Sequence, residues 1–149
     1  DLTQRIYKDF TYDPHFSDVA TPLADVLKHK RGVCQDFAHL AIGCLRSLGY
    51  PARYVSGYLE TLPPPGEKKL IGADATHAWF AVYSPGEGWY EFDPTNNTLT
   101  SAQHITTAWG RDYSDVTPLK GVIFGGGQSP QLLVSVDVQR VEENYIFGL

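Results

Sequence analysis

Apolar positions recur every three to four residues between Val33 and Leu48, and this spacing predicts an amphipathic helix. Gly49 and Pro51 follow directly and supply the stop signal of a helix C-terminus. Cys34 therefore falls in the first turn of the predicted helix. We expect the apolar stripe, Cys44 included, to face the core. The stripe consists of Phe37, Ala41, Cys44, Leu45 and Leu48.

Two shorter helices are predicted before the cysteine. One covers about residues 2–10, and the second runs from Thr21-Pro22 to about His29, since proline suits the first helical position. Between them, Tyr12-Asp13-Pro14 has the composition of a loop. The basic run Lys28-His29-Lys30-Arg31 is predicted to be a solvated surface turn, which we favour over a role in activating Cys34.

Strand patterns follow the cysteine helix. Ala52 to Leu59 and Ala75 to Ser84 are rich in aromatic and β-branched residues, and Trp89 to Asp93 resumes that pattern after the turn sequence Pro85-Gly86-Glu87-Gly88. Residues 131–141 alternate near the C-terminus and predict a further strand. These elements predict an α+β domain in which helices pack on an antiparallel sheet.

Two segments rich in glycine or proline lie between the predicted elements. Residues 60–73 contain Pro63-Pro64-Pro65-Gly66 and are predicted to form an exposed loop. Because this loop leads directly into the Ala75 strand, both a plain connection and a lid or specificity loop stay open. Gly125-Gly126-Gly127 lacks the flanking strand and helix of a phosphate-binding loop, and we expect a turn there.

Composition limits the function classes. The chain has 149 residues, 42% of them hydrophobic and 13% aromatic, so we expect one domain over residues 1–149. Twelve basic against 17 acidic residues give a net charge of −5 without a basic face, which makes nucleic acid and anionic membranes poor partners. The sequence contains no apolar run long enough to span a bilayer, and its first residues lack the features of a signal peptide.

The two cysteines, Cys34 and Cys44, lie ten residues apart on one predicted helix. At about 1.5 Å per residue this places them roughly 15 Å apart, well beyond the roughly 4.4 to 6.8 Å between the Cα atoms of a disulfide. Both are expected to be free thiols. Free thiols favour a reducing compartment, and we expect a cytoplasmic location.

Cys34 is the candidate nucleophile. In the first turn of a helix, unpaired backbone N–H groups and the positive end of the helix dipole favour the thiolate, which is the reactive form. A cysteine at a helix start is more often a small buried hydrophobe, however. A catalytic role therefore requires a base and a carboxylate nearby.

His77 and Asp93 are the candidate partners, because they lie on facing strands of the predicted hairpin. Where paired residue numbers sum to 170 the two are directly opposite, and where they sum to 172 they are one diagonal apart on the same face. A one-residue bulge would put them on opposite faces. In either regular register the carboxylate can fix the imidazole tautomer while the histidine exchanges a proton with the thiol.

The remaining histidines and the tryptophans are given structural roles. His39 lies too far along the helix to be the base of Cys34, and no pair of His, Cys or carboxylate side chains has structural zinc spacing, so no metal is predicted. Trp79 and Trp89 are favoured as core residues over walls of an acyl pocket. The histidines in loops or at element ends are His15, His29 and His104.

Five stretches between about residues 30 and 118 resemble the transglutaminase-like superfamily, and in particular its bacterial branch of papain-like cysteine enzymes. Each stretch alone is a weak signal, but five in this order and at this spacing are a specific match. They are Gly32-Val33-Cys34-Gln35-Asp36-Phe37-Ala38, Gly49 to Tyr58, Thr76-His77-Ala78-Trp79, Gly88 to Asn96 and Gly110 to Pro118.

The resemblance implies a papain-like cysteine-enzyme fold with a transglutaminase core. It implies Cys34 as the nucleophile, His77 as general base and acid, and Asp93 as the orienting carboxylate, without a cofactor. Related chains of the bacterial branch often carry an additional β-rich N-terminal domain. We therefore expect this sequence to be part of a longer protein.

These residues predict acyl transfer through a thioester, in which the Cys34 thiolate attacks the amide of a peptide or protein and His77 protonates the departing amine. The Cys34 backbone N–H and one further donor would hold the oxyanion, and Tyr12 is the candidate for that donor. Hydrolysis by a peptidase or amidase is favoured over glutamine–lysine crosslinking. Two alternatives stay open: a non-catalytic protein-binding module that retains the fold, and acyl transfer to a small-molecule amine of the arylamine acetyltransferase kind.

Overall fold

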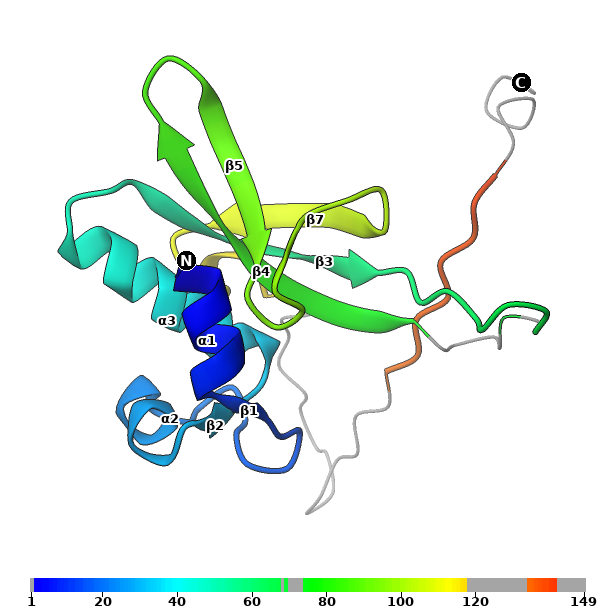
Figure 1. Ribbon diagram of the computed structural model, residues 1–149, viewed down its shortest axis with the longest axis horizontal. Coiled ribbons are helices and arrows are strands. Elements are labelled where there is room, and N and C mark those ends of the chain that lie inside the picture. Colours follow the sequence, from blue (N-terminus) through cyan, green and yellow to red (C-terminus); the bar gives the residue numbers. More distant parts are fainter. Residues whose placement is uncertain (1, 68, 70–73, 118–133, 142–149) are drawn as a thin grey trace, which may run out of the picture.

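The computed structural model describes residues 2–67, 69, 74–117 and 134–141, in which helices pack on an antiparallel sheet (Figure 1). The helices are α1 (Leu2–Asp9), α2 (Leu23–His29) and α3 (Cys34–Ser47), with a 3₁₀ turn, η1, at Tyr113–Asp115. The strands are β1 (Thr11–Tyr12), β2 (Arg31–Gly32), β3 (Ala52–Leu59), β4 (Ala75–Ser84), β5 (Gly88–Asp93), β6 (Thr98–Leu99) and β7 (His104–Gly110). The five-stranded sheet has the order β6-β5-β4-β3-β7, and β1 pairs with β2 in a separate parallel ribbon.

Helix α3 begins at Cys34, as its sequence predicts, because the residues before it are held by a buried carboxylate. Asp36 Oδ2 accepts hydrogen bonds from the Val33 backbone N–H at 2.8 Å and from the Ser17 hydroxyl at 2.5 Å. A Cβ atom on Gly32 would lie 2.7 Å from the same oxygen, so the close approach requires glycine. The entry of the chain into α3, and with it the position of Cys34, is thereby fixed.

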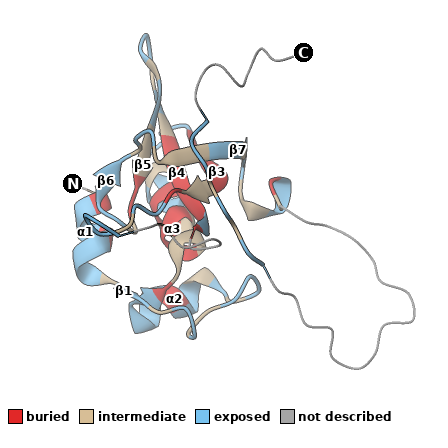
Figure 2. Ribbon diagram, turned by 90° about the vertical axis from the view of Figure 1, so that its right-hand side faces the viewer, coloured by how far each residue is buried: buried red, intermediate tan, exposed pale blue. Residues whose placement is uncertain are grey.

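The core lies between α3 and the inner face of the sheet (Figure 2). It joins Phe37 and Ala41 of α3 to Tyr54 of β3 and Phe80 of β4. The prediction that Cys44 fills the core is wrong, because this side chain is exposed. The buried residues of α3 all lie between Asp36 and Ile42, so Cys44 shares their side of the helix but lies past the part that the core covers.

The β4–β5 hairpin takes the second of the two predicted registers. Phe80 pairs with Phe92 and Ala81 with Glu91, so paired numbers sum to 172, and the described pairs show no bulge. Continued by one pair, this register leaves Asp93 one diagonal from His77 on the same face of the sheet. The predicted boundaries of β3 and β4 are confirmed.

Four strands were not predicted. β1, β2 and β6 have two residues each, too few for a periodic signal, and β7 is an edge strand that pairs with β3 across a register shift between Ser56 and Gly57. The loop predicted at Tyr12 is therefore partly strand.

The predicted C-terminal strand is wrong for residues 134–141, which form a single bridge between Asp74 and Val136. Side chains hold this segment instead: Asp74 Oδ2 accepts from the Val138 backbone N–H at 2.6 Å, and Arg140 forms a forked ion pair with Glu60. Because Glu60 opens the predicted exposed loop, that loop is tied to the C-terminal segment. Residues 131–133 and the glycine run at 125–127 lie outside the described residues.

None of the helices in the described part of the chain is both long and apolar enough to cross a bilayer.

A substitution at Gly57 tests the close packing of β3 against β7. A Cβ atom there would lie 2.1 Å from the Ile105 carbonyl oxygen and 2.7 Å from the Trp79 ring, whereas one on Gly43 of α3 would meet nothing within 4 Å. We expect Gly57→Ala to lower the free energy of unfolding in urea by about 2 kcal/mol, and Gly43→Ala to leave it equal or slightly higher because alanine favours helix. Equal stability of the two variants would contradict this packing.

Candidate active site

Cys34 at the start of α3 and His77 on β4 meet at the seam between helix and sheet. His77 Nε2 lies 2.7 Å from Asp93 Oδ2, which leaves Nδ1 of the ring for its second hydrogen-bond partner, Cys34. The structure thus brings the three predicted catalytic residues together in the order thiol, imidazole, carboxylate. This order is the one that nucleophilic catalysis by a cysteine requires.

The electrostatics of the trio favour a charged imidazole. Burial by itself would lower the pKa of His77, but hydrogen bonds to Asp93 and Cys34 outweigh it and raise the pKa to about 9. Burial would likewise raise the pKa of Asp93, but the hydrogen bond and charge of His77 hold it at about 2. At neutral pH the imidazolium therefore lies between the anionic Asp93 carboxylate and Cys34.

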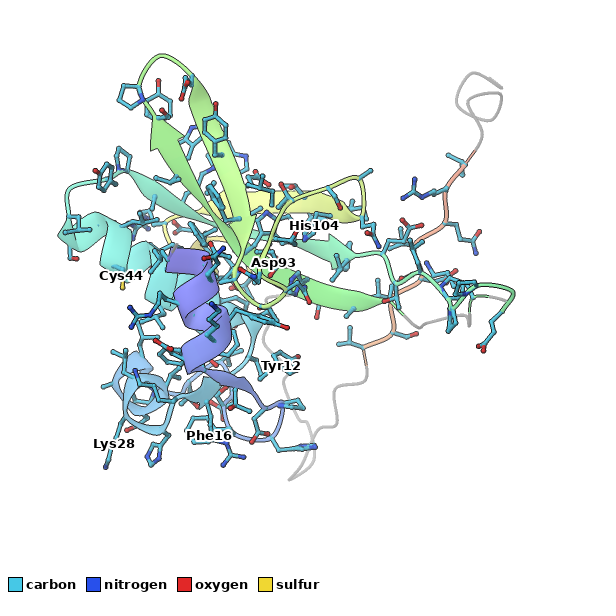
Figure 3. All side chains as sticks on the ribbon, in the orientation of Figure 1. Tyr12, Phe16, Lys28, Cys44, Asp93 and His104 are labelled. Atoms are coloured by element: carbon cyan, nitrogen blue, oxygen red, sulfur yellow. The ribbon has the colours of Figure 1, made fainter. Side chains whose placement is uncertain are left out.

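Asp93 is the most heavily hydrogen-bonded group of the site, and its side chain has no exposed surface. Oδ1 accepts from the backbone N–H groups of Thr95 at 2.9 Å and Asn96 at 3.2 Å. Oδ2 accepts from the Asn96 side-chain amide at 2.7 Å and faces the imidazoles of His77 at 2.7 Å and His104 at 3.1 Å (Figure 3). The carboxylate is therefore both ionised and fixed in direction.

His104 is the residue of this cluster that the sequence did not reveal. The sequence predicted only that His104 lies in a loop or at the end of an element, and it is the first residue of β7. Strand β7 reaches the site through its pairing with β3, which is distant in the sequence. No spacing along the chain connects position 104 with position 93. The fold alone places the second imidazole on Asp93.

His77, Asp93 and His104 are also a candidate for metal binding, since their ligand atoms lie within 4.8 Å of one another. The separations from each Nε2 to Asp93 Oδ2 are 2.7 and 3.1 Å, however, and these are hydrogen-bond distances. Ligand atoms around a tetrahedral zinc ion would lie about 3.3 Å apart. The distances therefore fit hydrogen bonds from the two imidazoles to Asp93 better than the joint coordination of a metal ion.

A cleft of about 680 Å³ opens in front of Cys34 and His77. Among the described residues that line it there is no Lys, Arg, Asp or Glu, and besides Cys34 and His77 its polar side chains are those of tyrosine, serine, threonine and Gln35. Val134 to Val136 of the C-terminal segment form part of the wall. The tyrosines are Tyr12, Tyr54, Tyr58 and Tyr113.

Tyr12, the predicted oxyanion donor, lies in this cleft on β1 and is 53% exposed. Partial burial and the nearby charge of Cys34 raise its pKa, so the hydroxyl keeps its proton and can donate a hydrogen bond. Strand β2, its partner, leads directly into the start of α3. The β1–β2 ribbon thus places Tyr12 close to the start of α3, where Cys34 lies.

The aromatic residues behind the cleft have separate roles. Trp79 is fully buried, donates its indole N–H to Glu91 at 2.8 Å and contacts the rings of His77 and His104, so the core role predicted for it is confirmed. The core role predicted for Trp89 is wrong: it is 41% exposed and lies on the Arg53 guanidinium. Neither tryptophan is among the residues that line the cleft.

His39 is a packed helix residue, as expected. Its ring stacks on Tyr54 with centroids 4.8 Å apart, and Nε2 accepts the Tyr113 backbone N–H at 3.2 Å. This contact holds η1 against α3 and thereby presents Tyr113 to the cleft.

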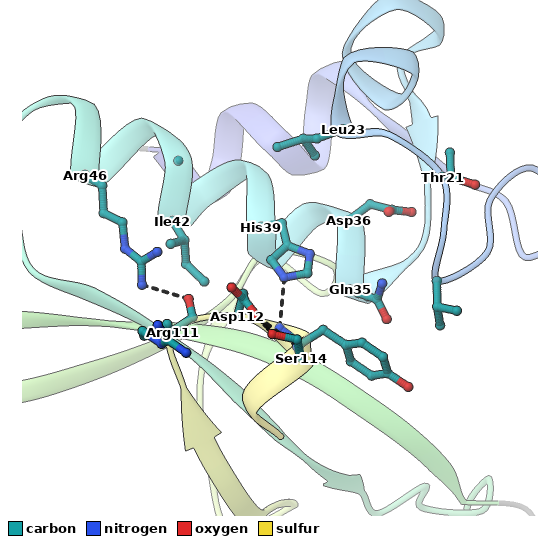
Figure 4. A pocket seen from close by; sticks show the side chains of 13 residues that line it. Thr21, Leu23, Gln35, Asp36, His39, Ile42, Arg46, Arg111, Asp112 and Ser114 are labelled. Atoms are coloured by element: carbon teal, nitrogen blue, oxygen red, sulfur yellow. Dashed lines mark hydrogen bonds between the residues drawn. The ribbon is translucent and has the colours of Figure 1, made fainter. Parts of the chain in front are cut away.

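A second cavity, of about 410 Å³, shares Val19, Gln35 and Tyr113 with the cleft (Figure 4). Its charged lining is already engaged within the fold: Arg46 donates to the carbonyls of Ala52 and Arg111, and Arg111 forms a forked ion pair with Asp115. The block Gly110 to Pro118, singled out by its sequence, therefore acts as a scaffold in its described part, up to residue 117.

Comparison with known proteins agrees with this geometry. The Transglutaminase-like superfamily model matches residues 1–94, a span that contains Cys34, His77 and Asp93. An uncharacterised protein of Mycobacterium tuberculosis is 49% identical over 146 residues, which are 95% of this chain and 46% of that protein. The chain thus spans about half the length of this relative.

Two further similarities carry more specific names. The crystal structure of a candidate cysteine protease from Cytophaga hutchinsonii has a TM-score of 0.64 and 34% sequence identity, over 78% of this chain and 36% of that one. A protein-glutamine gamma-glutamyltransferase of Pseudomonas aeruginosa is 37% identical over 67 residues, 44% of this chain and 10% of that protein. Since the family model matches well over half of the chain and the helices pack on the antiparallel sheet as in a papain-like core, this protein belongs to the transglutaminase-like superfamily.

Proposed function

We propose that this protein catalyses acyl transfer from an amide or peptide bond through a thioester on Cys34, and that water is the acceptor. The observation that carries the proposal is the His77 imidazole, which is bound on one nitrogen by the buried Asp93 carboxylate and on the other by Cys34. A raised imidazole pKa in contact with a thiol supports a thiolate–imidazolium pair at neutral pH.

In the proposed reaction the Cys34 sulfur attacks the amide carbon, and the carbonyl oxygen becomes an oxyanion. The Cys34 backbone N–H at the start of α3 and the Tyr12 hydroxyl are the proposed donors to that oxyanion. His77 gives its proton to the departing nitrogen, so that an amine or ammonia leaves and the acyl group stays on sulfur. His77, now neutral, takes a proton from water, which attacks the thioester and releases the carboxylic acid and the thiol.

The cleft supports a neutral acyl donor. A charged side chain that entered it would lose water and meet no Lys, Arg, Asp or Glu among the described lining residues, where the proposed thiolate–imidazolium pair supplies the charge, and such burial is costly. A peptide carbonyl or a side-chain carboxamide carries no charge, and tyrosine hydroxyls can hydrogen-bond to it. We therefore propose a peptide or protein substrate that presents uncharged groups to the cleft.

The same lining favours hydrolysis over crosslinking. A lysine acceptor arrives as a cation, and the cleft offers it no carboxylate among the described lining residues, whereas water needs none. A non-catalytic binding module and transfer to small-molecule amines stay as alternatives without a structural observation in their favour.

Alkylation by iodoacetamide tests the proposed nucleophile, with the exposed Cys44 as an internal control. At pH 6 we expect Cys34 to react about tenfold faster than Cys44, because the His77 imidazolium holds it as a thiolate while an ordinary thiol stays protonated. The advantage should shrink toward pH 9, where ordinary thiols ionise and His77 loses its proton. His77→Ala should remove it. Mass spectrometry reads both sites, and equal rates in the unaltered protein would sink the proposal.

A glutamine-containing peptide without charged residues tests the choice of acceptor. With a primary amine present in excess, we expect mass spectrometry to show mainly the free acid and little of the amide adduct. Cys34→Ser should abolish both products, because serine lacks the ionisable thiol. A dominant adduct would support the thioester and reverse the assignment of water as the acceptor.

Tyr12→Phe tests the second oxyanion donor. We expect kcat/KM for the uncharged peptide to fall at least about tenfold, because the oxyanion loses a hydrogen bond, while the iodoacetamide rate at Cys34 stays the same, since alkylation forms no oxyanion. Tyr7→Phe, on the exposed side of α1, is the matched control. Unchanged turnover in Tyr12→Phe would remove Tyr12 from the mechanism.

A further inference from the structure

Asp93 faces two imidazoles at the same carboxylate oxygen, and the proposed reaction uses only one of them. His77 Nε2 lies 2.7 Å and His104 Nε2 3.1 Å from Oδ2. The His104 side chain is 5% exposed, and its ring centroid lies 6.1 Å from that of His77. A buried imidazole on a catalytic carboxylate needs a physical explanation.

The protonation of His104 follows from its other nitrogen. Nδ1 accepts the backbone N–H of Ser101 at 3.2 Å, and because a backbone N–H only donates, Nδ1 carries no hydrogen. The hydrogen of the neutral ring is therefore on Nε2, where it points at Asp93.

Two further contacts hold the ring in place. The His104 backbone N–H donates to the Ser101 carbonyl at 2.9 Å, which closes the turn that carries both residues. On its other side the His104 ring meets Trp79 edge-on, with centroids 5.2 Å apart and an interplanar angle of 84°. Gly57 leaves room for the Trp79 ring, because a Cβ atom there would lie 2.7 Å from it.

We propose that His104 is a positioning residue of this active site: a neutral imidazole, locked in one tautomer, that holds the Asp93 carboxylate in the direction His77 requires. The proposal rests on the proposed thiolate–imidazolium chemistry of Cys34 and His77. His104 touches neither the thiol nor the substrate cleft and acts through Asp93.

The neutral state of His104 matters for charge balance. Among the described residues, the charged or titratable groups that face Asp93 are His77 from β4 and His104 from β7. Glu91, on the same strand as Asp93, accepts the indole N–H of Trp79. A second imidazolium would compete with His77 for a single negative charge and repel it. As a neutral donor, His104 supplies a hydrogen bond to Asp93 while the compensating positive charge stays on His77.

Two variants separate the donor from the ring. His104→Phe keeps a flat ring against Trp79 and removes the N–H, whereas His104→Gln keeps a side-chain N–H and removes the ring. In His104→Phe we expect turnover of the uncharged peptide to fall about tenfold. The upper limb of the pH profile for turnover, which follows deprotonation of His77, should move upward by about half a pH unit, because Asp93 then shares its charge with one donor fewer. His104→Gln should restore both toward the unaltered protein.

A purely structural role predicts a different result. Loss of packing would lower the melting temperature of His104→Phe and leave the pH profile of the folded enzyme where it was, and that outcome overturns the proposal. Equal shifts in the Phe and Gln variants overturn it as well, since the donor would then be irrelevant. The alkylation rate of Cys34 in the unaltered protein shows which of the two hypotheses has failed. If Cys34 reacts faster than Cys44 but the pH profile of His104→Phe is unchanged, only the role of His104 is contradicted and the proposed function stands.

Discussion

The buried charge of Asp93 is the constraint on which the site depends. An ionised carboxylate without solvent contact is costly unless every oxygen is hydrogen-bonded, and here the donors come from the turn after β5, from β4 and from β7. Satisfying one side chain therefore requires that three parts of the sheet come together. The position of the His77 imidazole is a consequence of that requirement, because its Nε2 is one of the donors.

The proposed nucleophile, Cys34, is placed by a second buried carboxylate, which is likewise hydrogen-bonded. Asp36 binds the Val33 backbone N–H and the Ser17 hydroxyl, so it fixes the residue before Cys34 and ties it to the loop before α2. Gly32 is required there because the carboxylate occupies the space of a Cβ atom. One carboxylate thus positions the base and another positions the start of α3, and the thiol and imidazole meet where the two arrangements join.

The sequence was sufficient for the parts of the site that depend on local signals. Helical spacing and the stop signal at Gly49 located α3 and the first-turn position of Cys34. Strand alternation and a tight turn gave two regular registers that put His77 and Asp93 on one face, and the structure has the register in which paired residue numbers sum to 172. Contacts between distant segments were beyond it. His104 reaches Asp93 through the pairing of β7 with β3. Cys44 lies on the buried side of α3 but beyond Ile42, the last buried residue, and how far along the helix the core extends is set by the fold. Periodicity also misled near the C-terminus, where residues 134–141 alternate without forming a paired strand.

The site separates its charges from its substrate surface. Asp93, His104 and the Nε2 side of His77 form a buried polar layer, whereas the described cleft lining in front of Cys34 is free of Lys, Arg, Asp and Glu. Charge therefore meets the substrate only at the thiol and at the one imidazole nitrogen that moves protons. In such a cleft, an uncharged amide gains attraction as its carbonyl becomes an oxyanion, while a charged group would lose hydration on entry. In the proposed function this arrangement would favour the transition state of amide attack over the binding of charged ligands, which is the physical basis for proposing a neutral acyl donor.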